Sequence, residues 1–272
     1  MRLPRCFLAT ISALLVAAQA VAAPDPTLAP WIDGPQRSEA NRARDGARQP
    51  AATLAFFGLR PDQTVVEIWP SVGLWWFEIL APYLRERGGY VAALHAGAHN
   101  PAAARAEQAA VAARMAADPA RFGAVRLAHS PGLGETVPDG SVDVVLTFSN
   151  LHNWIVDGNV GDVLREFQRA LKPGGVLGVV DHRGRDDIPQ AVQLKAGYLR
   201  EDEVVALIER AGFRLVARGD MAANPRDTKD HPAGVWTLPP SLRLKDVERD
   251  KYLAIGESDK FTLKFVKVGR PD

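Results

Sequence analysis

Histidine is the side chain best suited to move protons near neutral pH, and five of the six histidines in this chain follow short apolar runs. They are His95 and His99, His129, His152, and His182. Such runs are typical of buried strands, and the carboxyl ends of parallel strands meet at one edge of a sheet. We therefore expect these imidazoles to lie along one polar cleft, with His152 as the general base and His182 as a second candidate.

The turn after the first apolar run is a second candidate feature. It has the sequence Trp69-Pro70-Ser71-Val72-Gly73 and leads into a helical pattern. A glycine there lets a ligand approach the backbone closely, although an ordinary tight turn has a similar composition. Glu67 lies inside the strand, where a carboxylate needs a partner. Four tryptophans near this edge are either core aromatics or walls for a planar or cationic ligand: Trp69, Trp75, Trp76 and Trp154.

The spacing of the polar residues does not favour a metal. His95 and His99 are four positions apart, which aligns two ligands only on a helix, and Ala96-Gly97-Ala98 is typical of a loop. We expect no bound metal. Arg42 and Arg48 belong to a polar helical stretch, where they either hold a substrate carboxylate and close the pocket or form a solvated face.

Regular alternation of elements must position these residues. Strands are predicted over 64–69, 90–94, 124–128, 142–148, 176–180 and 213–217. Helices are predicted over 38–48, 50–58, 75–85, 101–117, 160–171 and 201–211. This order predicts an α/β protein with a doubly wound, mostly parallel sheet. Residues 261–268 alternate apolar and polar and predict a seventh, antiparallel strand after a long insertion at about 219–260.

Composition sets the broad class. The chain has 272 residues, of which 47% are hydrophobic and 24% charged, as in globular proteins. A formal charge of +1 gives no electrostatic footprint for nucleic acid, so no nucleic-acid partner is expected. The single cysteine, Cys6, leaves no disulfide or cysteine-based metal centre within the chain.

The N-terminus has the pattern of a secretory signal peptide over residues 1–22. Arg2 and Arg5 precede an apolar stretch, and Ala20-Val21-Ala22 resembles a cleavage site. We expect a periplasmic or secreted protein with no membrane span after cleavage, although an uncleaved anchor stays open. A linker is expected over 23–36 and a single domain over 37–272.

Several segments resemble a known family. Pro138-Asp-Gly-Ser-Val-Asp-Val-Val-Leu146 and Leu164-Arg-Glu-Phe-Gln-Arg-Ala-Leu-Lys-Pro-Gly-Gly175 resemble the class I, Rossmann-like methyltransferases that depend on S-adenosylmethionine (SAM). Glu67-Ile-Trp-Pro70 and Leu151-His-Asn-Trp154 resemble, more narrowly, its exported bacterial branch. The resemblance covers about residues 38–268.

The resemblance implies SAM as the cofactor and a role for each residue of the cleft. The methionine end would be held by Glu67, Trp69, Pro70, Ser71 and Gly73. His95 would meet the ribose, His129 and Ser130 the adenine, and Asn150 would border the cofactor. The substrate or a lid would involve Trp75, Asn153, Trp154, Arg42 and Arg48.

The sequence departs from that family at three places. Gly73 is all that remains of a glycine-rich turn, the second strand ends in Leu94-His95 without an acidic residue, and the third strand end lacks an Asp. Two functions therefore stay open beside a methyltransferase of an unknown small molecule. One is a catalytically silent ligand-binding protein on the same fold, and the other is a nicotinamide-dependent oxidoreductase, which an incomplete glycine motif disfavours. The oligomeric state is left open.

Overall fold

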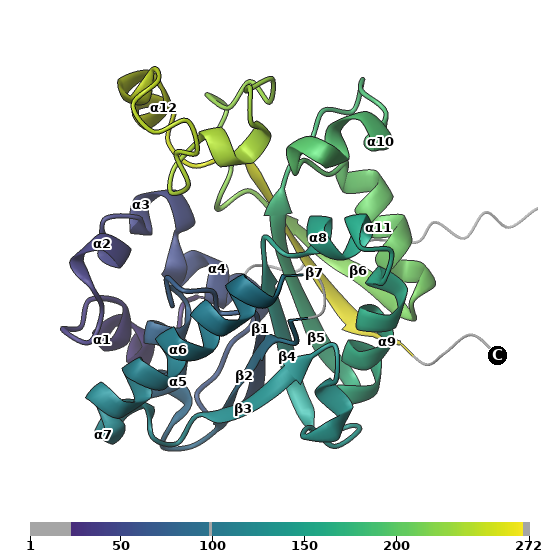
Figure 1. Cartoon of the computed structure of the whole chain (residues 1–272). Helices are drawn as coiled ribbons and strands as arrows, with labels where there is room; N and C mark the ends of the chain where they lie inside the picture. Colours follow the sequence, from purple (N-terminus) through teal and green to yellow (C-terminus); the bar gives the residue numbers. More distant parts are fainter. Residues whose placement is uncertain (1–22, 98–99, 269–272) are drawn as a thin grey trace, which may run out of the picture.

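The computed structural model describes residues 23–97 and 100–268. The predicted signal peptide, Cys6 and His99 lie outside the described residues. One seven-stranded sheet forms the centre of the molecule, in the order β3-β2-β1-β4-β5-β7-β6 (Figure 1). Its strands are β1 Thr64–Ile68, β2 Gly89–His95, β3 Arg126–Ser130, β4 Val142–Phe148, β5 Leu171–His182, β6 Phe213–Gly219 and β7 Lys260–Lys267.

Strand directions confirm the predicted architecture. Parallel pairs join β1 to β2 and β4, β2 to β3, and β4 to β5. Strand β7 runs antiparallel to both β5 and β6. The sheet is therefore a doubly wound, mostly parallel sheet whose last strand is antiparallel, as expected.

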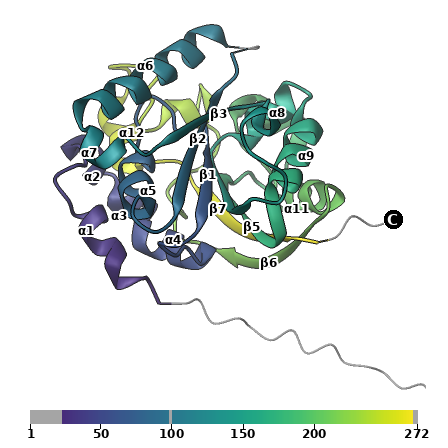
Figure 2. The same cartoon turned by 90° about the horizontal axis from the view of Figure 1, so that it is seen from below.

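Helices cover both faces of the sheet (Figure 2). On one side lie α4 Pro50–Phe57, α5 Phe77–Leu84, α6 Pro101–Ala117 and α7 Pro119–Phe122. On the other lie α8 Leu151–Val156, α9 Val160–Ala170 and α11 Glu201–Arg210. Adjacent residues of β1 bury their side chains in different cores, Val65 with the first group and Val66 with the second. This follows from the two-residue period of a strand.

Two segments outside this sandwich reach the end of the sheet where the parallel strands finish. The N-terminal segment contains η1 Pro26–Leu28, α1 Ala29–Ile32, α2 Glu39–Arg42 and α3 Asp45–Arg48. The insertion after β6 contains η4 Gly234–Thr237 and α12 Arg249–Ile255. Figure 1 shows α3 and α12 toward the same end of the molecule. None of the described helices is long and apolar enough to cross a bilayer.

Four segments differ from the sequence-based expectation. The expected linker contains η1 and α1, and Leu28 and Ile32 are buried in the core. The expected helix over 38–48 is two short helices. Strand β3 begins two residues later than predicted, and β5 already begins at Leu171, so the Pro-Gly-Gly segment expected to end a helix belongs to a strand. The remaining helices, α10 Gln190–Gln193 and η2 Leu133–Glu135 and η3 Leu194–Ala196, are single turns.

Candidate active site

A cavity of about 520 Å³ opens beyond the carboxyl ends of β1, β4 and β5. Its walls come from the turn after β1, the start of α8, the N-terminal segment, and the insertion up to the start of β7. The charged, aromatic and hydrogen-bonding residues of its lining include Arg44, Arg48, Glu67, Trp69, Gly73, Trp75, Trp76, Phe148, His152, His182, Trp236, Glu257, Ser258 and Lys260. The size is that of an ordinary small-molecule pocket.

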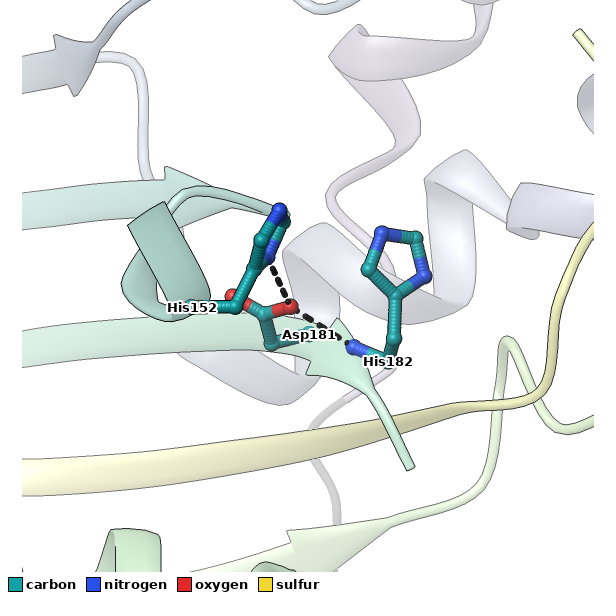
Figure 3. A group of neighbouring side chains, drawn as sticks. All are labelled: His152, Asp181 and His182. Atoms are coloured by element: carbon teal, nitrogen blue, oxygen red, sulfur yellow. Dashed lines mark hydrogen bonds and ion pairs between the residues drawn. The ribbon is translucent and has the colours of Figure 1, made fainter. Parts of the chain in front are cut away.

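An aspartate joins the two predicted histidines at the cavity floor (Figure 3). The His152 Nδ1 atom lies 3.1 Å from Asp181 Oδ1, and Asp181 also accepts from the backbone N–H groups of Leu151 and His182, each at 2.8 Å. The two imidazole rings lie side by side, with centroids 5.3 Å apart. Figure 3 shows the other ring nitrogen of His152 turned away from Asp181. That nitrogen is thus available to a ligand.

Electrostatics separate the roles of the two imidazoles. Burial alone would raise the pKa of Asp181, but the charge and hydrogen bond of His152 lower it, so the group is a carboxylate that accepts from Nδ1–H. In the neutral imidazole this bond favours the tautomer whose Nε2 carries the lone pair. Burial lowers the pKa of His182 to about 3, so His182 is neutral and a weak base. Its Nδ1 pairs with Ser258 Oγ at 2.6 Å.

Three cations surround one carboxylate on the adjacent wall. Glu257 accepts from Arg44 Nε at 2.7 Å, from Arg48 Nε at 3.2 Å and from Lys260 Nζ at 3.0 Å. Burial alone would raise the pKa of Glu257, but the charges of Lys260 and the two arginines hold it well below its usual range. Glu257 is therefore ionised and compensates a single positive charge.

The carboxyl group of Glu67 is protonated in this environment. Burial raises its pKa to about 8, and the Tyr90 hydroxyl bonded to it lowers the pKa only in part. The nearby Glu107 raises it further. Glu67 thus lines the cavity as a neutral group near pH 7 and adds no negative charge there.

The backbone of the turn after β1 is strained, and one of its N–H groups is already hydrogen-bonded to a protein side chain. Trp69, Ser71 and Leu74 have φ of 52°, 63° and 50°, in the left-handed region that non-glycine residues rarely adopt. The Ser71 N–H donates to Glu107 Oε1 at 2.8 Å. A Cβ atom built on Gly73 would meet only Ser71 Oγ, at 3.9 Å, so this glycine faces open space. The open part of the turn is therefore its glycine end.

Protein side chains cover the region where the nucleoside was expected. The Trp69 indole stacks on His95 with centroids 4.1 Å apart, and its Nε1 donates to Ser130 O at 2.9 Å. Its ring also contacts Trp154 edge-on. The second oxygen of Glu107 accepts from the His95 N–H at 2.7 Å. A carboxylate from α6 thus reaches the end of β2, where the sequence itself has no acidic residue.

The structure brings most of the predicted site residues together. Those that line the cavity are His152, His182, Glu67, Trp69, Pro70, Ser71, Gly73, Asn150, Trp75, Asn153 and Arg48. His95, His129, Ser130, Trp154 and Arg42 do not line it. His129 and Ser130 are part of β3, Trp154 is fully buried, and Arg42 is exposed and bonds the Arg37 carbonyl.

Sequence reasoning did not include several residues that build the site. They are Arg44, Glu107, Phe148, Asp181, Trp236, Glu257, Ser258 and Lys260. Asp181 was detectable as a polar residue at the end of a predicted strand. Glu257 and Lys260 were not, because nothing local indicates that the insertion returns to the cavity.

Comparisons with known proteins agree with this fold. Residues 78–179 match the family model described as a methyltransferase domain. A SAM-dependent methyltransferase from Aquifex aeolicus is 19% identical, with a TM-score of 0.54 over 90% of this chain and 99% of that one. An arsenic(III) SAM methyltransferase from Chlamydomonas reinhardtii is 16% identical, with a TM-score of 0.52 over 92% of this chain and 75% of that one.

A further neighbour has another activity. The cyclase SpnF is 17% identical, with a TM-score of 0.54 over 92% of this chain and 88% of that one. At these identities the solved structures establish a shared Rossmann-like methyltransferase fold. The methyltransferase domain and the methyltransferases among the neighbours imply SAM as the cofactor.

The cavity fits one half of SAM better than the other. Open space before Gly73 and the stacked rings of Trp76 and Phe148, 4.3 Å apart, offer an aromatic wall to a sulfonium group. At the ends of β2 and β3, where the nucleoside half is expected, the indole of Trp69 fills the space. The residues therefore fit the reacting end of SAM, whereas the position expected for its nucleoside is occupied by the Trp69 indole.

Proposed function

We propose that this protein is a SAM-dependent methyltransferase that acts on a small-molecule acceptor in the periplasm or outside the cell. The observation that carries the proposal is the His152–Asp181 pair, at 3.1 Å, on the floor of a cavity in a methyltransferase fold. A cyclase shares the fold, but the domain match over residues 78–179 favours methyl transfer.

The chain's own residues orient the acceptor and manage its proton. SAM, when bound, supplies an electrophilic methyl group on sulfur. Asp181 is a positioning residue, because its bond to Nδ1 leaves His152 Nε2 on the side of the ring away from the carboxylate. His152 Nε2 takes the proton of the acceptor as the acceptor oxygen bonds the methyl carbon. SAM held in the cavity would supply the methyl group and would keep the electron pair of the carbon–sulfur bond on sulfur, so charge and atoms balance.

Calorimetric titration with SAM, followed by measurement of S-adenosylhomocysteine formation with candidate acceptors, tests this assignment. We expect SAM binding and acceptor-dependent product. Binding of nicotinamide cofactors in place of SAM would contradict the assignment.

A second candidate has its own support. Trp69 and Glu107 occupy groups that a nucleoside would use, which favours a catalytically silent protein that binds ligands in the same cavity. Binding of small acids with neither SAM binding nor S-adenosylhomocysteine formation would select this alternative.

Export is proposed from the residues at the N-terminus alone. The mass of the protein recovered from a periplasmic fraction tests it, and we expect a chain beginning at Ala23. Recovery of the full-length chain in the cytoplasm alone would contradict export.

A further inference from the structure

The cavity carries an excess of positive charge. Three cations line it, Arg44, Arg48 and Lys260, and Glu257 is the one ionised carboxylate among the described residues of its lining, because Glu67 is neutral and the buried Asp181 is paired with His152. Glu257 and Lys260 have side chains only 6% exposed. Cations held away from water without a matching anion are costly, so a wall of this composition attracts an anionic ligand.

One guanidinium has an unused donor. Arg44 and Arg48 both contact Glu257 through Nε. Arg44 Nη2 is buried and has no hydrogen-bond partner within the described residues. A buried donor without a partner costs free energy that an added acceptor restores. The planar fork of a guanidinium matches a carboxylate better than other anions of small acids.

The walls beside these cations are flat and aromatic. The Arg48 guanidinium lies 5.0 Å from the centroid of the Trp75 ring. Trp76 stacks on Phe148 with ring planes at 16°. Trp236, from the insertion, lies 6.0 Å from the His152 ring. Surfaces of this kind suit a planar ring.

The base and the cations share one continuous wall. His152 lies beside His182, whose Nδ1 is 2.6 Å from Ser258 Oγ. Ser258 follows Glu257, the carboxylate to which both arginines bind. Arg44 and His152 thus line the same cavity, so an acceptor bound there can present a carboxylate to one and a hydroxyl to the other.

We propose that the acceptor is an aromatic hydroxy acid, held by its carboxylate on Arg44 and Arg48 with its hydroxyl toward His152. This rests on the proposed function for the transfer step, but the binding site itself does not. The hydroxyl oxygen gains the methyl group and loses its proton to His152 Nε2, while the carboxylate keeps its charge and its contacts.

The experiment compares 4-hydroxybenzoate with phenol, its uncharged analogue, by quenching of tryptophan fluorescence without cofactor. Tryptophans 75, 76 and 236 line the cavity and report on its occupant. We expect 4-hydroxybenzoate to bind at least tenfold more tightly than phenol. Arg44→Gln should weaken 4-hydroxybenzoate at least tenfold, Arg44→Lys less, and neither should change phenol binding. Arg42→Gln is the matched control, because Arg42 is exposed outside the cavity.

Further measurements distinguish binding of the acceptor carboxylate from binding of the SAM carboxylate. Thermal unfolding of each variant checks the fold, and Arg48→Gln gives a second test if Arg44→Gln unfolds. Equal binding of 4-hydroxybenzoate and phenol, or no effect of either arginine variant, would overturn the proposal. Loss of SAM binding in Arg44→Gln with 4-hydroxybenzoate binding unchanged would assign the guanidinium to the carboxylate of SAM and also overturn it. Failure of the wild type to bind SAM, with 4-hydroxybenzoate bound, would instead overturn only the proposed methyl transfer.

Discussion

The indole of Trp69 stacks on the imidazole of His95, with ring centroids 4.1 Å apart and planes at 25°. The two residues lie at the ends of adjacent strands, and Trp69 holds this position with a φ of 52°. A bulky residue in the left-handed region is strained, and such strain concentrates at functional sites. The pair thus covers the edge of the sheet at a conformational cost.

Removal of the Trp69 indole should expose the ends of β2 and β3. We expect Trp69→Ala to bind SAM about tenfold more tightly, on the order of 1.4 kcal/mol, because the nucleoside no longer has to displace the indole. Calorimetry with SAM measures the effect. Trp69→Phe keeps a stacking ring without the N–H bonded to Ser130 and should stay closer to the wild type. Weaker binding in Trp69→Ala would mean that the indole forms part of the cofactor pocket.

Loss of the base should affect turnover more than binding. We expect His152→Gln to reduce kcat by about 10²-fold or more, which is the usual contribution of a positioned base, with SAM affinity within about twofold. Asp181→Asn should reduce kcat by a smaller factor, since it disturbs only the tautomer and orientation of His152. Rates of S-adenosylhomocysteine formation give the comparison. An equal fall in SAM affinity and kcat would show that His152 supports the cofactor.

The buried carboxyl of Glu67 should give stability a characteristic pH dependence. Its pKa is about 8 in the folded chain and 4.5 in the reference state, so the folded protein binds the extra proton between these values. The contribution of Glu67 is present below about pH 4.5 and is lost as the pH rises through about 8, with a slope near 1.4 kcal/mol per pH unit.

Glu67→Gln has no titratable group at this position, so its free energy of unfolding lacks this pH-dependent contribution. Denaturant unfolding between pH 5 and pH 8 should therefore show the variant gaining stability relative to the wild type as the pH rises. Tyr90→Phe, which keeps the carboxyl, is the matched control and should retain a falling contribution. A constant difference between Glu67→Gln and wild type across this range would mean that the carboxyl stays ionised.

A larger side chain at Gly73 should fill the cavity without disturbing the fold. A Cβ atom at this position would lie 3.9 Å from Ser71 Oγ, which is an ordinary van der Waals contact. We expect Gly73→Val to unfold within a few degrees of the wild type and to bind SAM at least tenfold more weakly. Gly73→Ala should lie between the two. Normal SAM binding by Gly73→Val, measured by calorimetry, would place the cofactor away from this turn.

The sequence predicted the bounds of an element correctly where that element contains its own capping residues or strand pattern. Residues 101–117 form a helix as predicted, since Asn100 caps it and Pro101 occupies its first turn. Strand β4 likewise has its predicted bounds. Helix α8 was missed because it has only six residues and follows Ser149, whose φ of 60° turns the chain sharply. His152 was still found, because position after a strand was enough.

The site residues that were not predicted are those whose partners lie far away in the sequence. Arg44 and Glu257 are 213 positions apart, and no periodicity connects them. Glu107 lies in an Ala-rich helix whose pattern gives no reason to turn a carboxylate toward the ends of β1 and β2. Such contacts depend on how the elements pack, which residue spacing does not encode.

The ion pair between Arg44 and Glu257 joins two segments of the cavity wall that lie far apart in the sequence. The stretch that matches a methyltransferase domain, residues 78–179, contains neither residue. This wall of the cavity is thus built from two segments that lie on either side of the matched stretch in the sequence. Substitutions in these two segments can change the charge of the cavity wall while the matched stretch stays the same.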